Sequence, residues 1–223
     1  METLSIGICS GKSGDGKTTL AENLIRRIKQ KFKNIPLIGI KFTKTSLYSS
    51  IIIDPVDHDH KSKDTDRMKK AGADMVIWVK ATEADLSEIT RNLKAKINDL
   101  YATNQKKIVL VEGNSLVRTM ETDVIIFIDK NNANNKPSAK EVLERADIVI
   151  KWEYETEEIM EQIEKIEMRK KIEEALKERS NNGKIACAEA RKIAEELKIP
   201  YIEVGRLANE LKIKIRKCEL GCF

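Results

Sequence analysis

Aromatic residues are scarce in this chain, since Phe, Trp and Tyr together make up only 4% of its 223 residues. The hydrophobic core must therefore be built mainly from Ile, Leu, Val and Ala. No apolar run approaches the length of a membrane span, and the N-terminus lacks the cationic, apolar and small-residue succession of a secretory signal. We therefore expect a cytoplasmic protein without a membrane-spanning segment.

Cysteine is also rare, with four residues in the chain. In a cytosolic protein they are expected to be reduced, metal-bound or redox-active rather than paired in structural disulfides. Neither sign of charge dominates, because 41 basic residues face 36 acidic ones and leave a net charge of +5. This balance does not by itself indicate a nucleic-acid-binding protein.

One stretch near the N-terminus has the pattern of a phosphate-binding loop. Gly11 and Gly16 are separated by four residues and are followed by Lys17 and Thr18. Glycines let backbone N–H groups curl around a phosphate, the lysine reaches the β and γ phosphates, and the hydroxyl ligates Mg²⁺. The candidate phosphate-binding residues are Gly11, Lys12, Ser13, Gly14, Asp15, Gly16, Lys17, Thr18 and Thr19.

Apolar strands alternate with helical patterns through the first two thirds of the chain. Strands are predicted at 4–9, 35–41, 51–53, 75–79, 108–111, 123–129 and 148–150, and helices at 19–33, 64–71, 84–101 and 138–146. This alternation predicts an α/β fold, a phosphate-loop NTPase whose mostly parallel sheet is covered by helices on both faces. Ligands of such sheets bind beyond the carboxyl ends of the strands, where we expect the loop, Asp54 and Glu112.

The sequence divides into three parts. We expect a nucleotide-binding domain over 1–152, a charged connecting helix over 153–180 and a small C-terminal module over 181–223. The narrow apolar stripe of the helix leaves a dimerising coil as the alternative. Two short helical patterns and a basic strand in the last part resemble a winged helix-turn-helix.

Acidic residues at strand and helix ends are the candidate metal ligands. Glu112 closes an apolar strand, where nucleotide hydrolases place the acid that holds Mg²⁺ or its water. Asp54 and Asp64 are further candidates, although Asp54 also suits an ordinary turn before Pro55 and Asp64 a helix cap. The expected metal ligands are therefore Thr18, Glu112, Asp64 and Asp54, and the expected catalytic residues are Lys17 and Glu112.

Three basic residues are candidates for contacts to anions. Lys12 lies inside the loop and could reach across a dimer to the partner's nucleotide, contact its own triphosphate or face solvent. Arg67 and Lys69 could contact a phosphate or be solvated.

Two groups of possible transition-metal ligands stand apart from the loop. Asp57 to His60 hold two histidines and two aspartates, and Cys187, Cys218 and Cys222 lie in the C-terminal module, without a standard zinc spacing. Loop residues and packed thiols are the alternatives. No Asn-Lys-x-Asp run marks a guanine-binding loop, so the residues leave GTP and ATP open.

Taken together, these motifs resemble the molybdopterin-guanine dinucleotide biosynthesis protein B (MobB) family. The resemblance runs from Ser5 to about Lys151 and is carried by the following segments: Gly11 to Thr19, Gly39-Ile40-Lys41, Lys63 to Arg67, Ala71-Gly72-Ala73, Val111-Glu112-Gly113 and Ala146 to Ile150. The chain departs from the family at Phe42-Thr43-Lys44, where relatives usually place histidines, and in the longer stretch from Thr45 to Lys61. These departures concern the substrate more than nucleotide binding.

The resemblance implies a GTP-binding, weakly hydrolysing homodimer that assists attachment of a nucleotide to the molybdenum or tungsten cofactor. Its partners would be a nucleoside triphosphate with Mg²⁺, and molybdopterin or another cofactor-biosynthesis protein. The family pattern carries Lys17, Thr18, Asp64 and Glu112 over as site positions.

Two other functions remain open from the residues. One is a nucleotide-gated regulator whose C-terminal module binds DNA, because residues 181–223 carry nine Lys or Arg against six acids. The other is a metal-delivery or partitioning-type ATPase that dimerises on nucleotide. The role of the C-terminal module itself stays open.

Overall fold

The computed structural model describes residues 3–55, 64–101, 105–130, 137–151 and 153–217. The chain divides into two compact units, Met1–Gln162 and Ile163–Phe223. The three-part division expected from the sequence, with limits after residues 152 and 180, stays a prediction.

A seven-stranded sheet with the order β3-β4-β2-β5-β1-β6-β7 forms the centre of the first unit. All neighbouring strands pair in parallel except β3 and β4, which are antiparallel. The predicted mostly parallel α/β fold is therefore confirmed. The strands are β1 (Thr3–Ser10), β2 (Leu37–Lys44), β3 (Ser50–Ile53), β4 (Met75–Ala81), β5 (Lys107–Glu112), β6 (Val124–Ile128) and β7 (Ile148–Ile150).

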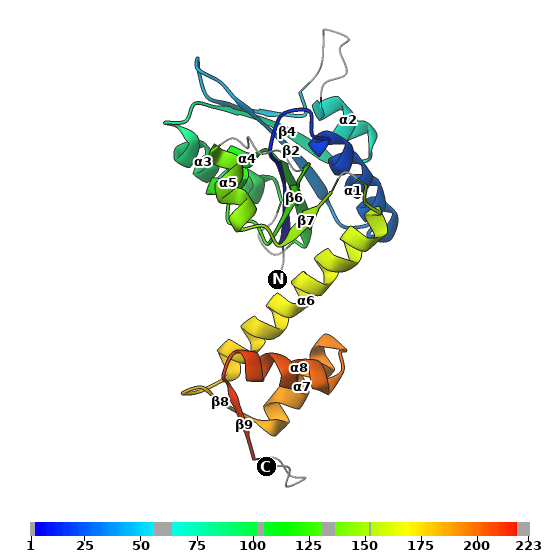
Figure 1. Ribbon diagram of the computed structural model, residues 1–223, viewed down its shortest axis with the longest axis vertical. Helices are drawn as coiled ribbons and strands as arrows, with labels where there is room; N and C mark the ends of the chain where they lie inside the picture. Colours follow the sequence, from blue (N-terminus) through cyan, green and yellow to red (C-terminus); the bar gives the residue numbers. More distant parts are fainter. Residues whose placement is uncertain (1–2, 56–63, 102–104, 131–136, 152, 218–223) are drawn as a thin grey trace. The chain divides into compact units, whose positions relative to one another are not determined.

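Helices cover both faces of this sheet (Figure 1). Helices α1 and α2 lie together on one face, and α3, α4 and α5 lie on the other. Their bounds are α1 (Lys17–Lys31), α2 (Asp64–Lys70), α3 (Leu86–Leu100), α4 (Asn114–Thr119) and α5 (Pro137–Glu144). The short helix α4 has no counterpart among the predictions, because six residues are too few for a helical period to be visible.

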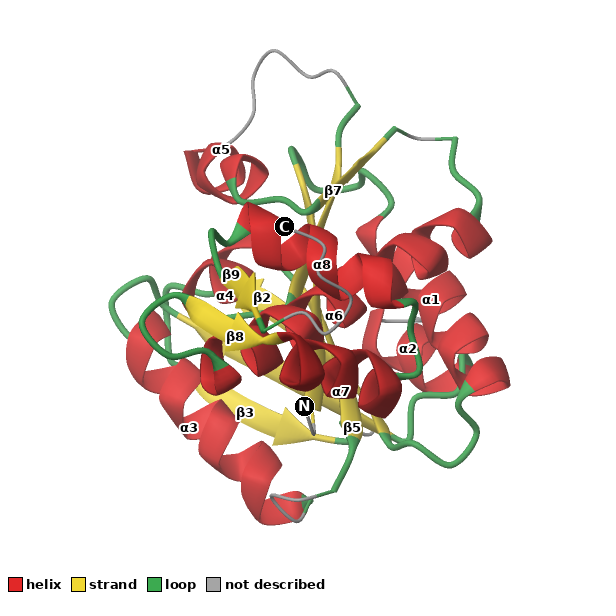
Figure 2. Ribbon diagram, turned by 90° about the horizontal axis from the view of Figure 1, so that it is seen from below, coloured by secondary structure: helices red, strands yellow, loops and turns green. Residues whose placement is uncertain are grey.

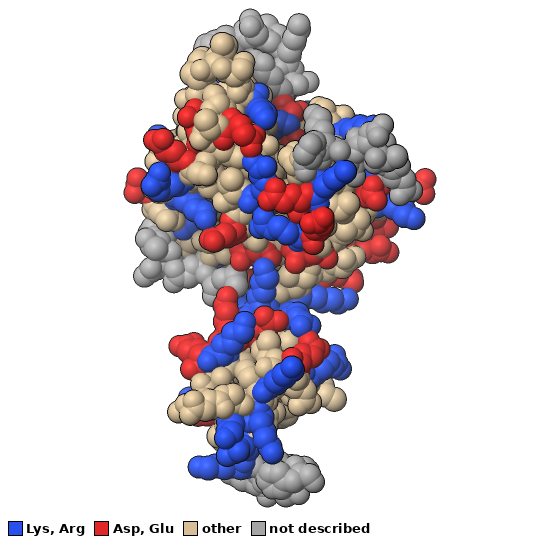
Figure 3. Space-filling model, turned by 60° about the vertical axis from the view of Figure 1, so that its left-hand side comes forward, with Lys and Arg blue, Asp and Glu red and all other residues tan. Residues whose placement is uncertain are grey.

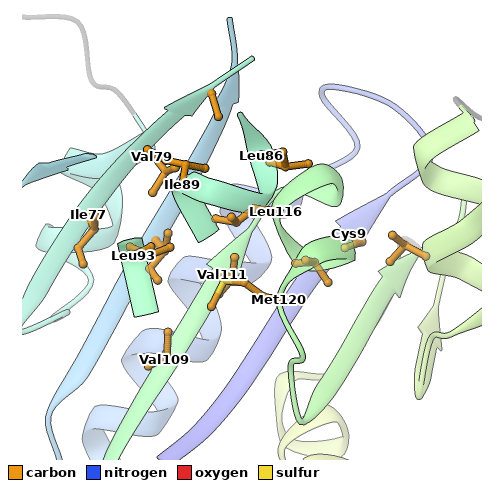
Figure 4. Close-up of a cluster of buried hydrophobic side chains, with 14 of the residues drawn as sticks. Cys9, Ile77, Val79, Leu86, Ile89, Leu93, Val109, Val111, Leu116 and Met120 are labelled. Carbon is orange, nitrogen blue, oxygen red and sulfur yellow. The ribbon is translucent and has the colours of Figure 1, made fainter. Parts of the chain in front are cut away.

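The core under α3 and α4 is made of the aliphatic residues that the composition requires. Leu86, Ile89, Leu93 and Ile97 of α3 are buried at the predicted spacing of three and four. All four belong to one cluster with side chains from the central strands. Figure 4 shows Leu86, Ile89 and Leu93 in this cluster together with Val111. Because every residue of β5 is buried, its terminal carboxylate at Glu112 also lies inside the protein.

The second unit has a core of its own. It begins within α6 (Thr156–Arg179) and contains β8 (Lys184–Ala186), α7 (Cys187–Leu197), α8 (Tyr201–Glu210) and β9 (Lys214–Arg216). Ile172 and Leu176 of α6 are buried with residues of α7 and α8. The apolar stripe of α6 thus packs within the protein at these positions.

The two predicted short helices of the C-terminal module are present. In a winged helix-turn-helix the strand after them would form a hairpin, but within the residues described it does not. Instead β9 pairs in parallel with β8, which precedes the first helix, and Figure 2 draws the two strands side by side. A strand of three residues such as β8 is too short to show alternation in the sequence.

Candidate functional site

The predicted phosphate loop connects β1 to α1 at the carboxyl edge of the sheet. Gly14 and Gly16 adopt φ angles of 86° and 96°, a region that favours glycine. The backbone N–H of Lys12 donates a 2.6 Å hydrogen bond to the Asp15 carboxylate, which is buried. Asp15 therefore shapes the loop from inside, and α1 begins directly after the loop at Lys17, so its N-terminal backbone amides are available to an anion bound there.

Lys17 lies over this loop. Its ammonium group donates to Ser10 Oγ at 2.7 Å and to the Lys12 carbonyl at 3.0 Å. Burial lowers the pKa of Lys17, the nearby Glu112 carboxylate opposes that shift, and the Lys41 ammonium adds to it. A partly desolvated ammonium held by one hydroxyl and one backbone carbonyl is suited to bind an entering anion.

Thr18 and Glu112 meet beneath the loop. The Thr18 hydroxyl lies 3.1 and 3.0 Å from the two Glu112 carboxylate oxygens and donates to that carboxylate. Glu112 is only 1% exposed. A fully buried carboxylate requires compensation, so this position is not that of a solvated surface acid.

Lys41, which was not among the predicted site residues, supplies this compensation. Its ammonium forms ion pairs with both Glu112 and Asp64. Burial would lower the pKa of Lys41, but the Glu112 charge and the hydrogen bonds to Asp64 and Glu112 outweigh it and raise the pKa. The available signal was a lysine directly after the apolar residues of the predicted strand at 35–41.

Asp64 is brought to the site as predicted, at the first turn of α2. Burial would raise the pKa of its carboxyl, but the hydrogen bond and charge of Lys41 hold the pKa below its ordinary value. Glu112 and Asp64 thus both pair with the Lys41 ammonium, and the Thr18 hydroxyl bonds to Glu112, so hydroxyl and carboxylate oxygens lie together here. Oxygen donors of this kind are those that Mg²⁺ prefers, so the residues fit the metal.

Asp54 does not lie at this edge, where the sequence predicted it, and its role as a metal ligand stays a prediction. Strand β3 is antiparallel to β4, and Asp54 follows the end of β3 beside the start of β4. Its carboxylate accepts hydrogen bonds from Val76 N at 2.9 Å and Lys69 Nζ at 3.0 Å. Asp54 thus lies beside Val76, five residues before the carboxyl end of β4 at Ala81, which is roughly 16 Å at about 3.3 Å per residue.

The basic residues predicted to contact anions do not all lie near the loop. Lys69 accompanies Asp54, away from the loop. Arg67 lies near the loop and donates hydrogen bonds to the Glu22 carboxylate at 2.6 Å and to the Thr19 hydroxyl at 3.2 Å. Lys12 is exposed, as are Ser13 and Thr19.

The junction of β5 with α4 joins two strand ends at the loop. Asn114 accepts a hydrogen bond from Ser10 N at 3.1 Å and donates one to Ser10 O at 2.8 Å. Gly113 has a φ of 140°, and a Cβ there would lie 2.7 Å from Phe42 Cβ. Only glycine suits this turn, which places Asn114 against the end of β1 where the loop begins.

A cavity of about 630 Å³ opens beside the loop. Among the described residues its lining is mainly cationic, with one carboxylate, that of Glu83, against Lys12, Lys17, Lys41, Lys44 and Arg118. Such a charge distribution attracts anionic ligands.

The predicted transition-metal groups lie largely outside the described residues. This applies to Asp57 to His60 and to Cys218 and Cys222, whereas Cys187 begins α7. Within the residues described, no group of three or more His, Cys, Asp or Glu side chains is placed to hold a metal ion. Over the same residues, no helix is both long and apolar enough to cross a membrane.

Comparison with known proteins places the chain in a family. No curated protein matches it. Among solved structures, one described as the chimerical protein CapA2B2 is 15% identical, with a TM-score of 0.37, and the match covers 68% of this chain and 77% of that one. The family model described as "Molybdopterin guanine dinucleotide synthesis protein B" (MobB) matches residues 6–141, which hold the loop, Lys41, Asp64 and Glu112. The chain therefore belongs to the MobB family.

Proposed function

We propose that this protein is a Mg²⁺-dependent GTP-binding protein and slow GTPase that assists molybdenum or tungsten cofactor biosynthesis. The family description supports the biosynthetic context. The site geometry supports nucleotide binding. The choice of GTP before ATP rests on the family resemblance, because the sequence holds no Asn-Lys-x-Asp run.

The observation that carries this proposal is the hydrogen bond between Thr18 and the buried Glu112 beneath the loop. It joins the hydroxyl that follows the loop lysine to the carboxylate at the end of the neighbouring strand β5. In nucleotide hydrolases these two groups hold Mg²⁺ on the β and γ phosphates. Here Lys17 and the loop amides would bind the phosphates, and Thr18, Glu112 and Asp64 would hold the metal.

Bound Mg²⁺ would neutralise charge on the triphosphate, and the protein's own residues support only slow turnover. The loop contains no Arg. Arg118 lines the adjacent cavity but forms ion pairs with Glu83 and Glu141. Since an arginine finger contributes about 10³- to 10⁵-fold in rate, we expect turnover far below one per second without a partner.

Calorimetric titration of GTP and of ATP, each with Mg²⁺, tests the proposal. Wild-type protein is expected to bind GTP, and Lys17→Ala to lose at least roughly tenfold in affinity, because a charge-assisted contact to phosphate contributes about 1.5–3 kcal/mol. Lys29→Ala, on the same helix but paired with Asp74, is the matched control and should bind as the wild type does. Equal binding to wild type and Lys17→Ala would contradict the proposal, as would hydrolysis at tens per second by the isolated protein.

The oligomeric state is part of the same proposal. The exposed Lys12 side chain supports a role across a homodimer, since its backbone rather than its ammonium forms the contacts within the loop. Sedimentation with GTP or ATP tests this. Association driven by ATP but not GTP, and lost in Lys12→Ala, would favour the partitioning-type ATPase instead.

A DNA-binding role for the second unit is the second candidate function. Strands β8 and β9 pair in parallel with Lys184 opposite Lys214, and both lysines are exposed. Figure 3 shows Lys and Arg side chains gathered at one end of this unit. A gel shift with duplex DNA whose affinity falls steeply with salt, and falls again in Lys214→Ala, would support this function.

A further inference from the structure

The cavity beside the loop extends well beyond the phosphate-binding residues. One wall is the loop itself, which leads into α1 on one face of the sheet. The opposite wall comes from the end of β2, from the segment between β4 and α3, and from α4 and α5, which belong to the other face. We call this the far wall, and define it by Lys44, Glu83, Ser115, Arg118 and Ser138.

The far wall already holds one anionic group. Glu83 reaches into the cavity with one carboxylate oxygen 2.9 Å from Lys44 Nζ, and its other oxygen forms an ion pair with Arg118. These contacts hold the pKa of Glu83 below its ordinary value. The nitrogens of Lys44 and Arg118 are therefore spaced to bind a single small anion between them.

Resting on the proposed function, we propose that the far wall is a binding site for the phosphate monoester group of a second small molecule. The Glu83 carboxylate, which pairs with Lys44 and Arg118, marks the position that this group would take. A ligand that displaces Glu83 meets the Lys44 ammonium and the Arg118 guanidinium, which also pairs with Glu141 at 3.6 Å. A phosphate monoester carries up to two negative charges near neutral pH and can engage both cations.

One further feature favours phosphate over carboxylate. Ser115 and Ser138 add neutral hydroxyl donors to the same wall, and a phosphate has three terminal oxygens to accept them. The planar fork of donors on Arg118 can bind either group. The ligand would thus lie in the same cavity as the triphosphate, with its phosphate at the far end.

Titration with glycerol 3-phosphate, with glycerol as the uncharged probe, tests this inference. The protein is first saturated with Mg²⁺ and a non-hydrolysable GTP analogue, so that the loop is filled. We expect glycerol 3-phosphate to bind and glycerol not to bind. Lys44→Ala and Arg118→Ala should each weaken binding by roughly tenfold or more, because each removes a charge-assisted contact.

Glu83→Gln gives the sharper result, because removing the competing carboxylate should strengthen binding several-fold. Its matched control is Glu121→Gln, which removes the same charge from an exposed ion pair with Lys94 outside the cavity, and should leave the affinity unchanged. Weaker binding in Glu83→Gln than in wild type would overturn the inference. So would wild-type affinity in Arg118→Ala, or no binding of glycerol 3-phosphate at all.

The outcome separates this inference from the proposed function. If Arg118→Ala abolishes binding of the GTP analogue, the far wall belongs to the nucleotide site, and the inference fails while the proposed function stands. If the analogue does not bind even the wild type, the proposed function fails. The same titration of nucleotide-free protein then tests the far wall, since Lys44, Arg118 and Glu83 are unaffected.

Discussion

Lys41 sets the ionic balance of the candidate site. It compensates one carboxylate that is fully buried, Glu112, and one that is partly buried, Asp64. The lowered pKa of Asp64 contributes stability that is present above its ordinary value of 3.8 and is lost as the pH falls through the folded-state value. The raised pKa of Lys41 contributes stability that is present below 10.5 and is lost as the pH rises through its folded-state value. Both contributions are complete at neutral pH.

We therefore predict that Lys41→Met lowers the free energy of unfolding at pH 7 by about 2–4 kcal/mol, because it leaves buried carboxylates without a cation. The pH dependence should also change. Without Lys41 the main cause of the lowered Asp64 pKa is lost, so the variant should lose less stability than the wild type as the pH falls through the acid range. Denaturant unfolding at several pH values measures both effects.

Mg²⁺ provides the complementary measurement for this variant. Millimolar Mg²⁺ should stabilise Lys41→Met more than the wild type, because the metal replaces the missing ammonium among the same oxygens. Lys94→Met, which breaks an exposed pair with Glu121, should change stability by less than about 1 kcal/mol and respond to neither pH nor metal in this way. Equal responses of the two variants would contradict the assignment of Lys41.

At the scale of elements, the junction between β5 and α4 holds the site together. The end of β5 carries Glu112, the turn at Gly113 packs on Phe42 of β2, and Asn114 bonds to the end of β1. Three parallel strand ends are thus joined at the point where the phosphate loop starts. Strain introduced here is expected to displace Glu112 from Thr18.

Gly113→Ala is predicted to destabilise the first unit by about 1–3 kcal/mol, because the residue must keep a positive φ and its Cβ would overlap Phe42. Nucleotide affinity should fall with it. Gly205→Ala is the matched control, since Gly205 lies inside α8 with open space around its Cβ position. That change should stabilise the second unit by roughly 0.5–1 kcal/mol. Thermal unfolding of both variants would contradict the interpretation if the two changes had the same sign.

At the scale of the whole molecule, each of the two units has its own hydrophobic core. The candidate site uses residues of the first unit alone. The second unit is built around Leu176 of α6 and the facing residues of α7 and α8. Damage to the second core should therefore leave the nucleotide site unchanged.

Leu176→Ala is predicted to lower the unfolding free energy of the second unit by roughly 2–5 kcal/mol, with no change in GTP affinity. Leu24 is buried in α1, so Leu24→Ala should instead destabilise the first unit and weaken GTP binding, while leaving the second unit unchanged. Differential scanning calorimetry and titration of both variants check this. A loss of GTP affinity in Leu176→Ala would mean that the two units are energetically coupled.

The sequence by itself determined the features that depend on neighbouring residues. Loop spacing, the strand before the loop and the helix after it are all local, and so the phosphate loop, the order of helices and strands and the acid at Glu112 were predictable. The helix α4 and strand β8 were too short for their periods to appear.

Only the tertiary structure decided which distant residues meet. Lys41, Asp64 and Glu112 come from β2, α2 and β5, and no local pattern encodes their contact. The antiparallel direction of β3, which moves Asp54 to the opposite edge, likewise depends on how the chain returns between β2 and β4. Pairing between strands joins backbone groups far apart in the chain, and alternation of polar and apolar residues is the same for either strand direction.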